Sequence, residues 1–188
     1  MNEVMENIFT RRSVRMYQDK AIPKEILDEI IKAGNAAPSG ANVQAWRFVI
    51  VQDKETRKKL ADLAAPRVAK WMEQYSNETF KTLRKRLTAQ NPDTVYYGAP
   101  AIVFVIGSGN MAPYDCPMVC ENMMLAARSL ELGSCWVLFG QLVIDEPEVK
   151  KMLELKDDEK VYGPILLGYP KGAFPPPPPK KEPVAKWV

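Results

Sequence analysis

Three arginines and a serine occur within five residues near the N-terminus, in the segment Arg11-Arg12-Ser13-Val14-Arg15. Guanidinium groups match the anionic oxygens of a phosphate in charge and geometry, and a hydroxyl and nearby backbone N–H groups can complete such a site. A solvated basic stretch is the alternative, because cations at the C-terminal end of a helix interact favourably with the helix dipole. Considered alone, the segment favours this alternative, and a phosphate site requires support from other segments.

A loop of small and amide residues, 37–46, could contact the edge of a heteroaromatic ring. Ser39, Asn42 and Gln44 could present hydrogen-bond donors and acceptors, and Gly40 allows the backbone to approach a ligand closely. Ordinary turn residues between a helix and a strand explain the same composition. The loop by itself slightly favours the turn.

Two further segments could complete a ligand site. Residues 132–140 could direct backbone N–H groups towards a ligand, although their side chains fit a buried strand. The C-terminal segment combines five prolines, 175–179, with Lys180 and Lys181. Proline runs favour the stiff polyproline II conformation. The two lysines are therefore carried on an extended arm, as a second phosphate contact or simply as a soluble end.

The residue types that are missing exclude several kinds of chemistry. The chain has no histidine, which excludes serine–histidine triads, histidine general bases and most zinc sites. Its three cysteines, Cys116, Cys120 and Cys135, form no disulfide framework and are typical of a reducing compartment. Cys116 and Cys120 are four residues apart on an apolar helix, which favours core packing, so we expect no metal site.

The charge and hydropathy patterns exclude two classes of partner. A net charge of +3 is too small to imply a polyanionic partner, and the basic run 81–86 fits a solvated helix face, so we expect no nucleic acid. The longest apolar run, 99–106, is far shorter than the ~20 residues that span a bilayer, and the N-terminus does not resemble a signal peptide. We therefore expect a soluble, cytoplasmic protein with no membrane partner.

A single domain, 1–188, is expected from a length of 188 residues and a hydrophobic fraction of 46%. The patterns predict helices over 3–10, 23–34, 53–63, 115–132 and 146–155, and strands over 46–51, 99–106, 135–139 and 160–167. Such alternation indicates an α/β or α+β fold. Residues 66–90 are predicted to be helical but mobile, within a lid region over 64–97, and residues 169–188 form the extended arm.

In this order, five segments resemble the FMN-dependent nitroreductase family in its shorter-chain branch. The matching segments are 11–17, 37–48, 98–100, 132–136 and 167–170. The resemblance implies an α+β fold of three α/β/α layers with a central, mostly antiparallel sheet. It also implies an intertwined homodimer with exchange of the C-terminal arms and with two FMN sites at the dimer interface.

The resemblance further implies three groups of cofactor-binding residues. The group at the phosphate and ribityl chain comprises Arg11, Arg12, Ser13 and Arg15, with Lys180 or Lys181 closing over the phosphate. The group along the isoalloxazine, from the other subunit, comprises Pro38, Ser39, Gly40 and Asn42, with Gln44 as a further candidate. The backbone around Leu138 and Phe139 would offer an N–H to the flavin N5.

The reaction implied is an oxidoreduction in which FMN carries the hydride chemistry. NADH or NADPH would reduce the flavin and leave, and a small organic acceptor such as a nitroaromatic or a quinone would follow in the same pocket, giving ping-pong kinetics. No side-chain acid is obligatory, so we name no catalytic residue. The alternatives are a flavin-dependent dehalogenase, a flavin-fragmenting enzyme, and an FMN-binding interaction module without NAD(P)H oxidase activity.

The chain departs from the family pattern at three places. Residues 137–139 are bulkier than the family's usual residues near the N5 contact, and Lys180-Lys181 replaces arginine, which alone binds phosphate bidentately. Residues 66–90 match no family segment. Their aromatic residues, Trp71, Tyr75 and Phe80, could stack on an aromatic substrate or could pack the lid onto the body of the protein.

Overall fold

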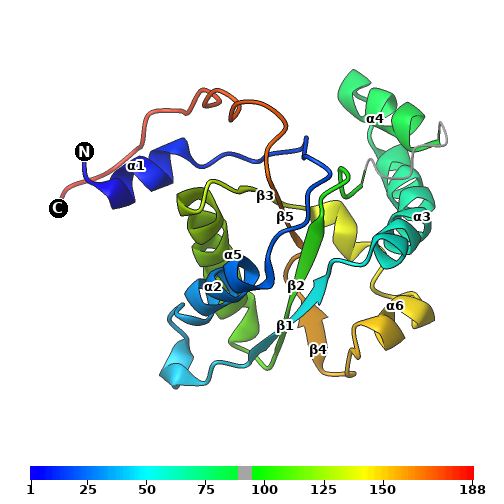
Figure 1. Ribbon diagram of the computed structural model, residues 1–188, viewed down its shortest axis with the longest axis horizontal. Helices are drawn as coiled ribbons and strands as arrows, with labels where there is room; N and C mark the ends of the chain where they lie inside the picture. Colours follow the sequence, from blue (N-terminus) through cyan, green and yellow to red (C-terminus); the bar gives the residue numbers. More distant parts are fainter. Residues whose placement is uncertain (89–94) are drawn as a thin grey trace.

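The computed structural model describes residues 1–88 and 95–188, and in these residues the strands form one five-stranded sheet (Figure 1). The strands are β1 (Trp46–Val51), β2 (Ala101–Ser108), β3 (Gly133–Trp136), β4 (Glu159–Val161) and β5 (Ile165–Gly168). Their order is β1-β2-β5-β3, and β4 pairs with the end of β2. Every strand pair is antiparallel, and β1 pairs with β2 along its whole length.

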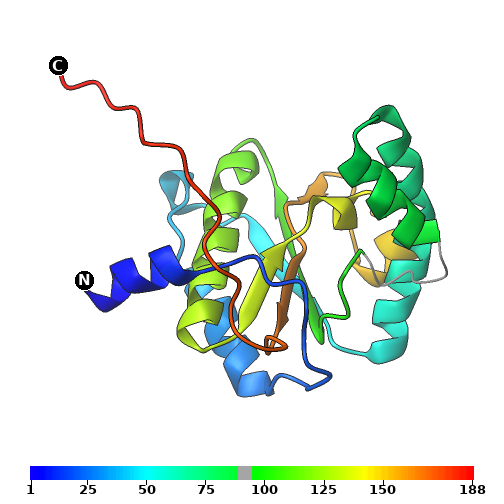
Figure 2. The ribbon, with the colours of Figure 1, turned by 90° about the horizontal axis from the view of Figure 1, so that it is seen from above.

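Helices cover both faces of this sheet, so the domain has three layers (Figure 2). One layer contains α2 (Lys24–Asn35) and α5 (Ala112–Ser129), and the other contains α3 (Lys54–Trp71), α4 (Glu78–Thr88) and α6 (Pro147–Met152). Alternate residues of β2 face opposite layers. Ile102, Phe104 and Ile106 belong to the core under α3 and α6, whereas Ala101, Val103 and Val105 belong to the core under α2 and α5. The α/β/α fold with an antiparallel sheet is therefore confirmed.

Elements with strong local signals have the predicted bounds. The first helix, α1, spans Glu3–Thr10, and the Asn2 side chain caps it by accepting a hydrogen bond from the Met5 N–H at 3.0 Å. Strand β1 spans residues 46–51 as predicted from its β-branched, apolar sequence. In both cases the residues within the element determine its ends.

The helix that follows β1 is longer than predicted. Asp53 caps α3 as expected, accepting from the Thr56 N–H at 2.8 Å, but the helix continues beyond the predicted end at 63 and includes Pro66. Proline removes one helical hydrogen bond. Ala64, Ala65 and Val68 are buried against the sheet on this stretch, and this burial outweighs the loss of the bond.

The predicted strand 135–139 is wrong in its second half. Strand β3 ends at Trp136, and the next residues form the short 3-10 helix η4 (Leu138–Gln141). The pairing of β3 with β5 ends here, because β5 begins only after Pro164. The Val137 N–H donates to the Pro164 carbonyl at 3.1 Å. Leu138 and Phe139 are therefore placed on a turn at the end of β3 rather than within the sheet.

Three other predicted elements are displaced or divided. The predicted strand 160–167 is two strands, β4 and β5, because Gly163 and a cis Pro164 separate them and proline has no N–H for the ladder. The predicted helix 115–132 is α5, which begins and ends three residues earlier. The predicted helix 146–155 is the shorter α6.

The two segments predicted as an arm and a lid lie at the periphery. Residues 171–188 contain no helix or strand and extend from the body of the protein (Figure 2). The described part of region 64–97 comprises the end of α3, the 3-10 turn η2 (Met72–Gln74), α4 and the turn at 95–97, while residues 89–94 lie outside the described residues. Among the helices of the described ranges, none is long and apolar enough to cross a membrane.

Candidate functional site

The arginine cluster (Arg11, Arg12, Ser13 and Arg15) is fixed on the edge of the sheet by the residue between its last two members. The Val14 N–H donates to the Ser134 carbonyl of β3 at 2.9 Å, and Ser13 and Ser134 form a parallel bridge. The Val14 side chain is buried over Gly133, where an added Cβ would lie only 2.7 Å from the Val14 Cβ. Glycine at 133 therefore allows the cluster to lie directly on β3.

A cavity of about 900 Å³ separates this cluster from the C-terminal arm. Its basic and hydroxyl lining comprises Arg11, Arg12, Ser13, Arg15 and Lys180, and the opposite wall is formed by 175–178. Lys181 does not line the cavity. The structure thus brings the predicted phosphate-binding residues together, with the first of the two lysines facing them.

The guanidinium groups of Arg11 and Arg12 in this cavity have different partners. The Arg12 Nη1 donates to the carbonyls of Phe9 and Arg11 at 2.7 and 2.6 Å, which holds the side chain at the end of α1. The Arg11 Nε lies 3.1 Å from a Glu121 carboxylate oxygen. The Arg11 Nε is therefore ion-paired, whereas the Arg12 Nε is buried and makes no hydrogen bond with any residue that the structure describes. A buried donor without an acceptor is costly, so the cavity is suited to an anion.

The groups beneath the cluster are neutral at pH 7. Burial raises the pKa of the Cys135 thiol, although Arg15 opposes this effect. Burial also raises the pKa of Tyr17, whose hydroxyl donates to the Val14 carbonyl at 2.6 Å, and that of Tyr97, whose ring centre lies 5.9 Å from the Arg15 guanidinium. These three groups therefore add no negative charge beneath the cluster, and the Glu121 carboxylate is paired with Arg11.

The predicted ring-binding loop, 37–46, has an unusual backbone. Ala41, Asn42 and Gln44 have φ angles of 50°, 56° and 51°, a left-handed conformation that non-glycine residues rarely adopt. The Ser39 hydroxyl accepts from the Gln44 N–H at 3.1 Å, and the buried carboxylate of Asp115 lies 3.3 Å from the Gly40 nitrogen that donates to it. Strain of this kind persists where the surrounding structure maintains it, often at ligand sites.

The loop and the arginine cluster lie at opposite ends of α5 (Figure 1). Asp115, in the first turn of α5, holds the loop, whereas Arg128, in the last turn, donates a hydrogen bond to Thr10 next to the cluster. Thirteen residues of helix separate these two contacts, or about 20 Å. Within one chain the structure therefore does not bring Pro38, Ser39, Gly40, Asn42 and Gln44 to the cavity of the cluster.

The predicted N5 contact lies beside a group of packed aromatic rings. Leu138 is exposed at the start of η4, and the Phe139 ring lies 5.5 Å from that of Trp71. Tyr75 lies 4.8 Å from Trp71 and stacks on Phe80 at 4.5 Å. In this structure the rings of the predicted lid thus pack on one another and on η4, which is the second of the two roles that the sequence left open.

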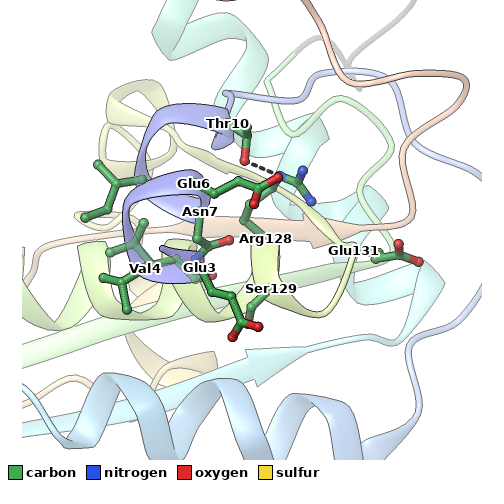
Figure 3. Close-up of a pocket in the computed structure, with 10 residues that line it drawn as sticks. Glu3, Val4, Glu6, Asn7, Thr10, Arg128, Ser129 and Glu131 are labelled. Atoms are coloured by element: carbon green, nitrogen blue, oxygen red, sulfur yellow. Dashed lines mark hydrogen bonds between the residues drawn. The ribbon is translucent and has the colours of Figure 1, made fainter. Parts of the chain in front are cut away.

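A separate cavity of about 520 Å³ lies between α1 and the end of α5 (Figure 3). Glu3, Glu6 and Glu131 line it together with Arg128. The three carboxylates would repel a phosphate, so this cavity is not a second site for the same ligand. No group of three potential metal ligands occurs among residues 1–88 and 95–188.

Comparison with known proteins identifies the family of the chain. The model of the nitroreductase family matches residues 8–169. The chain belongs to the nitroreductase family. Among solved structures, a nitroreductase of Bacteroides fragilis NCTC 9343 with bound FMN is 35% identical, with a TM-score of 0.83 and complete coverage of both chains. A nitroreductase of Desulfitobacterium hafniense DCB-2, also with bound FMN, is 25% identical with a TM-score of 0.84 and the same coverage. The NADPH-flavin oxidoreductase of Vibrio harveyi is 30% identical over 172 residues, which are 90% of this chain and 67% of that protein.

Several residues of this nitroreductase-family protein would not have been selected from the sequence. In the sequence, Asp115 is an ordinary acidic residue of a helix and Cys135 an ordinary thiol of an apolar strand. Only the fold places Asp115 beneath the loop and Cys135 beneath the arginine cluster. Phe139 was selected from the sequence as an N5 contact, but its packing in the aromatic group, some forty residues beyond the end of the predicted lid, was not. The local signal that pointed to this aromatic group was the aromatic composition of the segment around Trp71.

Proposed function

We propose that this chain is an FMN-dependent oxidoreductase that oxidises NADH or NADPH and reduces a small organic acceptor, such as a nitroaromatic or a quinone, by a ping-pong mechanism. Membership of the nitroreductase family supports this function, as do the FMN bound by the Bacteroides relative and the activity for which the Vibrio relative is named. The observation that carries the proposal is the cavity between the arginine cluster and Lys180, which is lined by three guanidinium groups, a hydroxyl and an ammonium group and where the buried Arg12 Nε has no acceptor among the described residues.

The residues of this cavity fit the phosphate group of FMN. A phosphate monoester offers three oxygens, and charge-assisted hydrogen bonds to such oxygens are about twice as strong as neutral ones. Arg11, Arg12 and Arg15 would supply guanidinium donors, Ser13 a hydroxyl, and Lys180 a charge from the opposite wall. We assign these five residues to the phosphate and the adjoining ribityl chain, and we assign no role to Lys181.

A second copy of the chain would complete the site. The loop 37–46 lies about 20 Å along α5 from the cluster, so its residues reach a flavin at the cluster only from another subunit. Exposed apolar side chains mark the surface that such a partner would cover, and they include Val4, Met5, Ile8 and Phe9 on α1 and Met111, Tyr114 and Met118 on α5. We therefore propose a two-fold homodimer with exchanged arms and two sites, in which each subunit lends Pro38, Ser39, Gly40, Asn42 and Gln44 to its partner's site.

Bound FMN would supply the hydride-transfer chemistry, and the residues of the chain would orient it and tune its charge. The first N–H groups of a helix have no acceptor within it, so those of Leu138 and Phe139 at the start of η4 can donate to the flavin N5. Cations and N–H donors favour the anionic form of a reduced ring electrostatically. We name no catalytic side chain, because the flavin carries the hydride chemistry and no side-chain acid is obligatory. The three free cysteines support a cytoplasmic location.

Flavin titration followed by anaerobic reduction tests this function. Purified protein should bind FMN with a yellow colour, and addition of NADH or NADPH without oxygen should bleach it; a quinone or nitroaromatic should then restore the colour. Protein that takes up no FMN would overturn the proposal. Yellow protein that neither nicotinamide reduces would instead indicate an FMN-binding module.

A further inference from the structure

Arg128 contacts two segments that are distant in the sequence. Its Nε donates a hydrogen bond to the Thr10 hydroxyl at 3.1 Å (Figure 3), and its guanidinium carbon lies 4.4 Å from the centre of the Phe174 ring. Thr10 directly precedes the arginine cluster, and Phe174 directly precedes the proline run of the arm. These two segments form the opposite walls of the cluster cavity. One side chain therefore holds both walls.

Phe174 is the point at which the arm is attached to the domain. It is half-buried, whereas every other residue of 171–188 is exposed. The last hydrogen bonds of the arm lie before it, from the Lys171 N–H to the Met16 carbonyl and from the Gln18 side chain to the Pro170 carbonyl. Beyond Phe174, the prolines 175–178 and Lys180 of the arm line the cavity.

The proline run transmits the direction that this attachment sets. Proline locks φ, and a polyproline II segment rises 3.1 Å per residue, so the six residues from Phe174 to Lys180 span roughly 19 Å with little internal freedom. A small rotation at Phe174 would therefore displace the Lys180 ammonium from the cavity by several ångströms. The place of Lys180 thus depends on how the Phe174 ring is held.

The neighbouring acidic residues do not account for Arg128. Glu3, Glu6 and Glu131 line, together with Arg128, the separate cavity between α1 and the end of α5. None of them forms an ion pair with Arg128 in the described structure. Its two specific contacts are with the hydroxyl of Thr10 and the face of Phe174. A guanidinium over an aromatic face is attracted by the ring quadrupole, and a lysine or an aliphatic side chain reproduces this geometry poorly.

We propose that Arg128 is a positioning residue for the phosphate of the cofactor: by stacking on Phe174 and bonding to Thr10, it fixes the arm so that Lys180 faces the arginine cluster. This inference rests on the proposed function, because it presumes that FMN binds at the cluster. Riboflavin, which lacks the phosphate, provides the specific test. A residue that acts through the phosphate contact changes the affinity for FMN and leaves that for riboflavin unaltered.

The experiment measures the dissociation constants of FMN and riboflavin by flavin fluorescence for the wild type and for Phe174→Leu, Phe174→Tyr and Arg128→Gln. Phe174 is on the arm, so its substitution does not threaten the folding of the domain. We expect Phe174→Leu to raise the constant for FMN about fivefold, with no change for riboflavin. Phe174→Tyr should retain the wild-type values because it retains the ring. In a Lys180→Ala background, Phe174→Leu should have no further effect, since the two residues act through one contact.

Four outcomes would overturn the inference. If Phe174→Leu bound FMN as tightly as the wild type, or lost affinity for FMN and riboflavin equally, the arm would not act on the phosphate. Additive effects of Phe174→Leu and Lys180→Ala would likewise show that the attachment at Phe174 does not act through Lys180. Wild-type protein that bound no FMN would overturn the proposed function and this inference together, so the two failures are distinguishable.

Discussion

Arg15→Ala is the sharpest test of the phosphate site, because Arg15 makes few stabilising contacts in the ligand-free protein. Its side chain is exposed, it donates a long hydrogen bond to the Ser13 carbonyl at 3.5 Å, and its guanidinium lies 5.9 Å from the Tyr97 ring. Truncation should therefore leave the free energy of unfolding within about 0.5 kcal/mol of the wild type. An effect on ligand binding would then come from the ligand contact itself.

The expected loss of FMN affinity follows from one charge-assisted contact. A hydrogen bond to a charged group contributes about 1.5–3 kcal/mol, so the dissociation constant should rise by roughly 10- to 150-fold. The rise should be smaller at high salt, because Arg15 is exposed and its charge is screened. Riboflavin affinity should not change.

Lys24→Ala is the matched control for this experiment. It also lowers the formal net charge of +3 by one, but Lys24 is an exposed residue of α2 that pairs only with Asp28. Isothermal titration with FMN and riboflavin at two salt concentrations would compare the two variants. Equal FMN affinity of Arg15→Ala and the wild type would refute the placement of the phosphate at this cluster, and an equal loss in Lys24→Ala would reduce the effect to overall charge.

Three further predictions concern stability and assembly. Glu159→Gln breaks the pair with Arg47, whose hydrogen bond lowers the pKa of Glu159 to about 2. Because this pKa lies below that of the unfolded chain, the pair stabilises the protein above about pH 4.3, and the difference in Tm between variant and wild type should shrink as the pH falls from 5 towards 2. A difference in Tm that is constant over this range would exclude the ion pair as its origin. Gly133→Ala should destabilise by about 1–3 kcal/mol in urea unfolding and weaken FMN binding, because its Cβ would meet Val14; unaltered stability would show that the cluster is not packed on β3 as described. Ile8→Glu should shift the protein from dimer to monomer in light scattering, since it charges the exposed apolar face of α1, and an intact dimer would place the interface elsewhere.

The fold was predictable from the sequence wherever short-range signals decide the structure. The bounds of α1 and β1 and the alternation of helices with strands were predicted, since their signals lie within each element, whereas the three-layer arrangement was implied by the family resemblance. The errors arose where tertiary contacts overrule local preference. Burial of Ala65 and Val68 carries α3 past Pro66, and Pro164 of a distant segment ends β3 before Leu138.

From residue types and spacing, the candidate site was predictable only as a set of separate residues, and their grouping was implied by the family resemblance. The types of Arg11, Arg15 and Lys180 are suited to a phosphate, but no spacing in the sequence indicates that a segment some 165 residues further on faces the cluster. Similarly, a buried Asp115 beneath Gly40 cannot be inferred from a carboxylate in the first turn of a helix, which is a common position for an acid. Contacts between distant segments depend on the sheet register, and the register follows from the whole core.

The length of α5 relates the two halves of the proposed site to assembly. One helix carries the attachment of the loop at its start and the attachment of the cluster at its end, so no movement of side chains can bring the two together in one subunit. A two-fold axis across α1 and α5 would place the start of one α5 near the end of the other and would supply both halves at once. A flavin that contacts both subunits binds the dimer in preference to the monomer, and it therefore stabilises the dimer by the same free energy by which dimerisation strengthens flavin binding. On this basis we propose that the exposed apolar face of α1 contributes to the dimer interface and that the adjoining arginine cluster binds the cofactor, so that the proposed binding residues begin where the proposed interface ends.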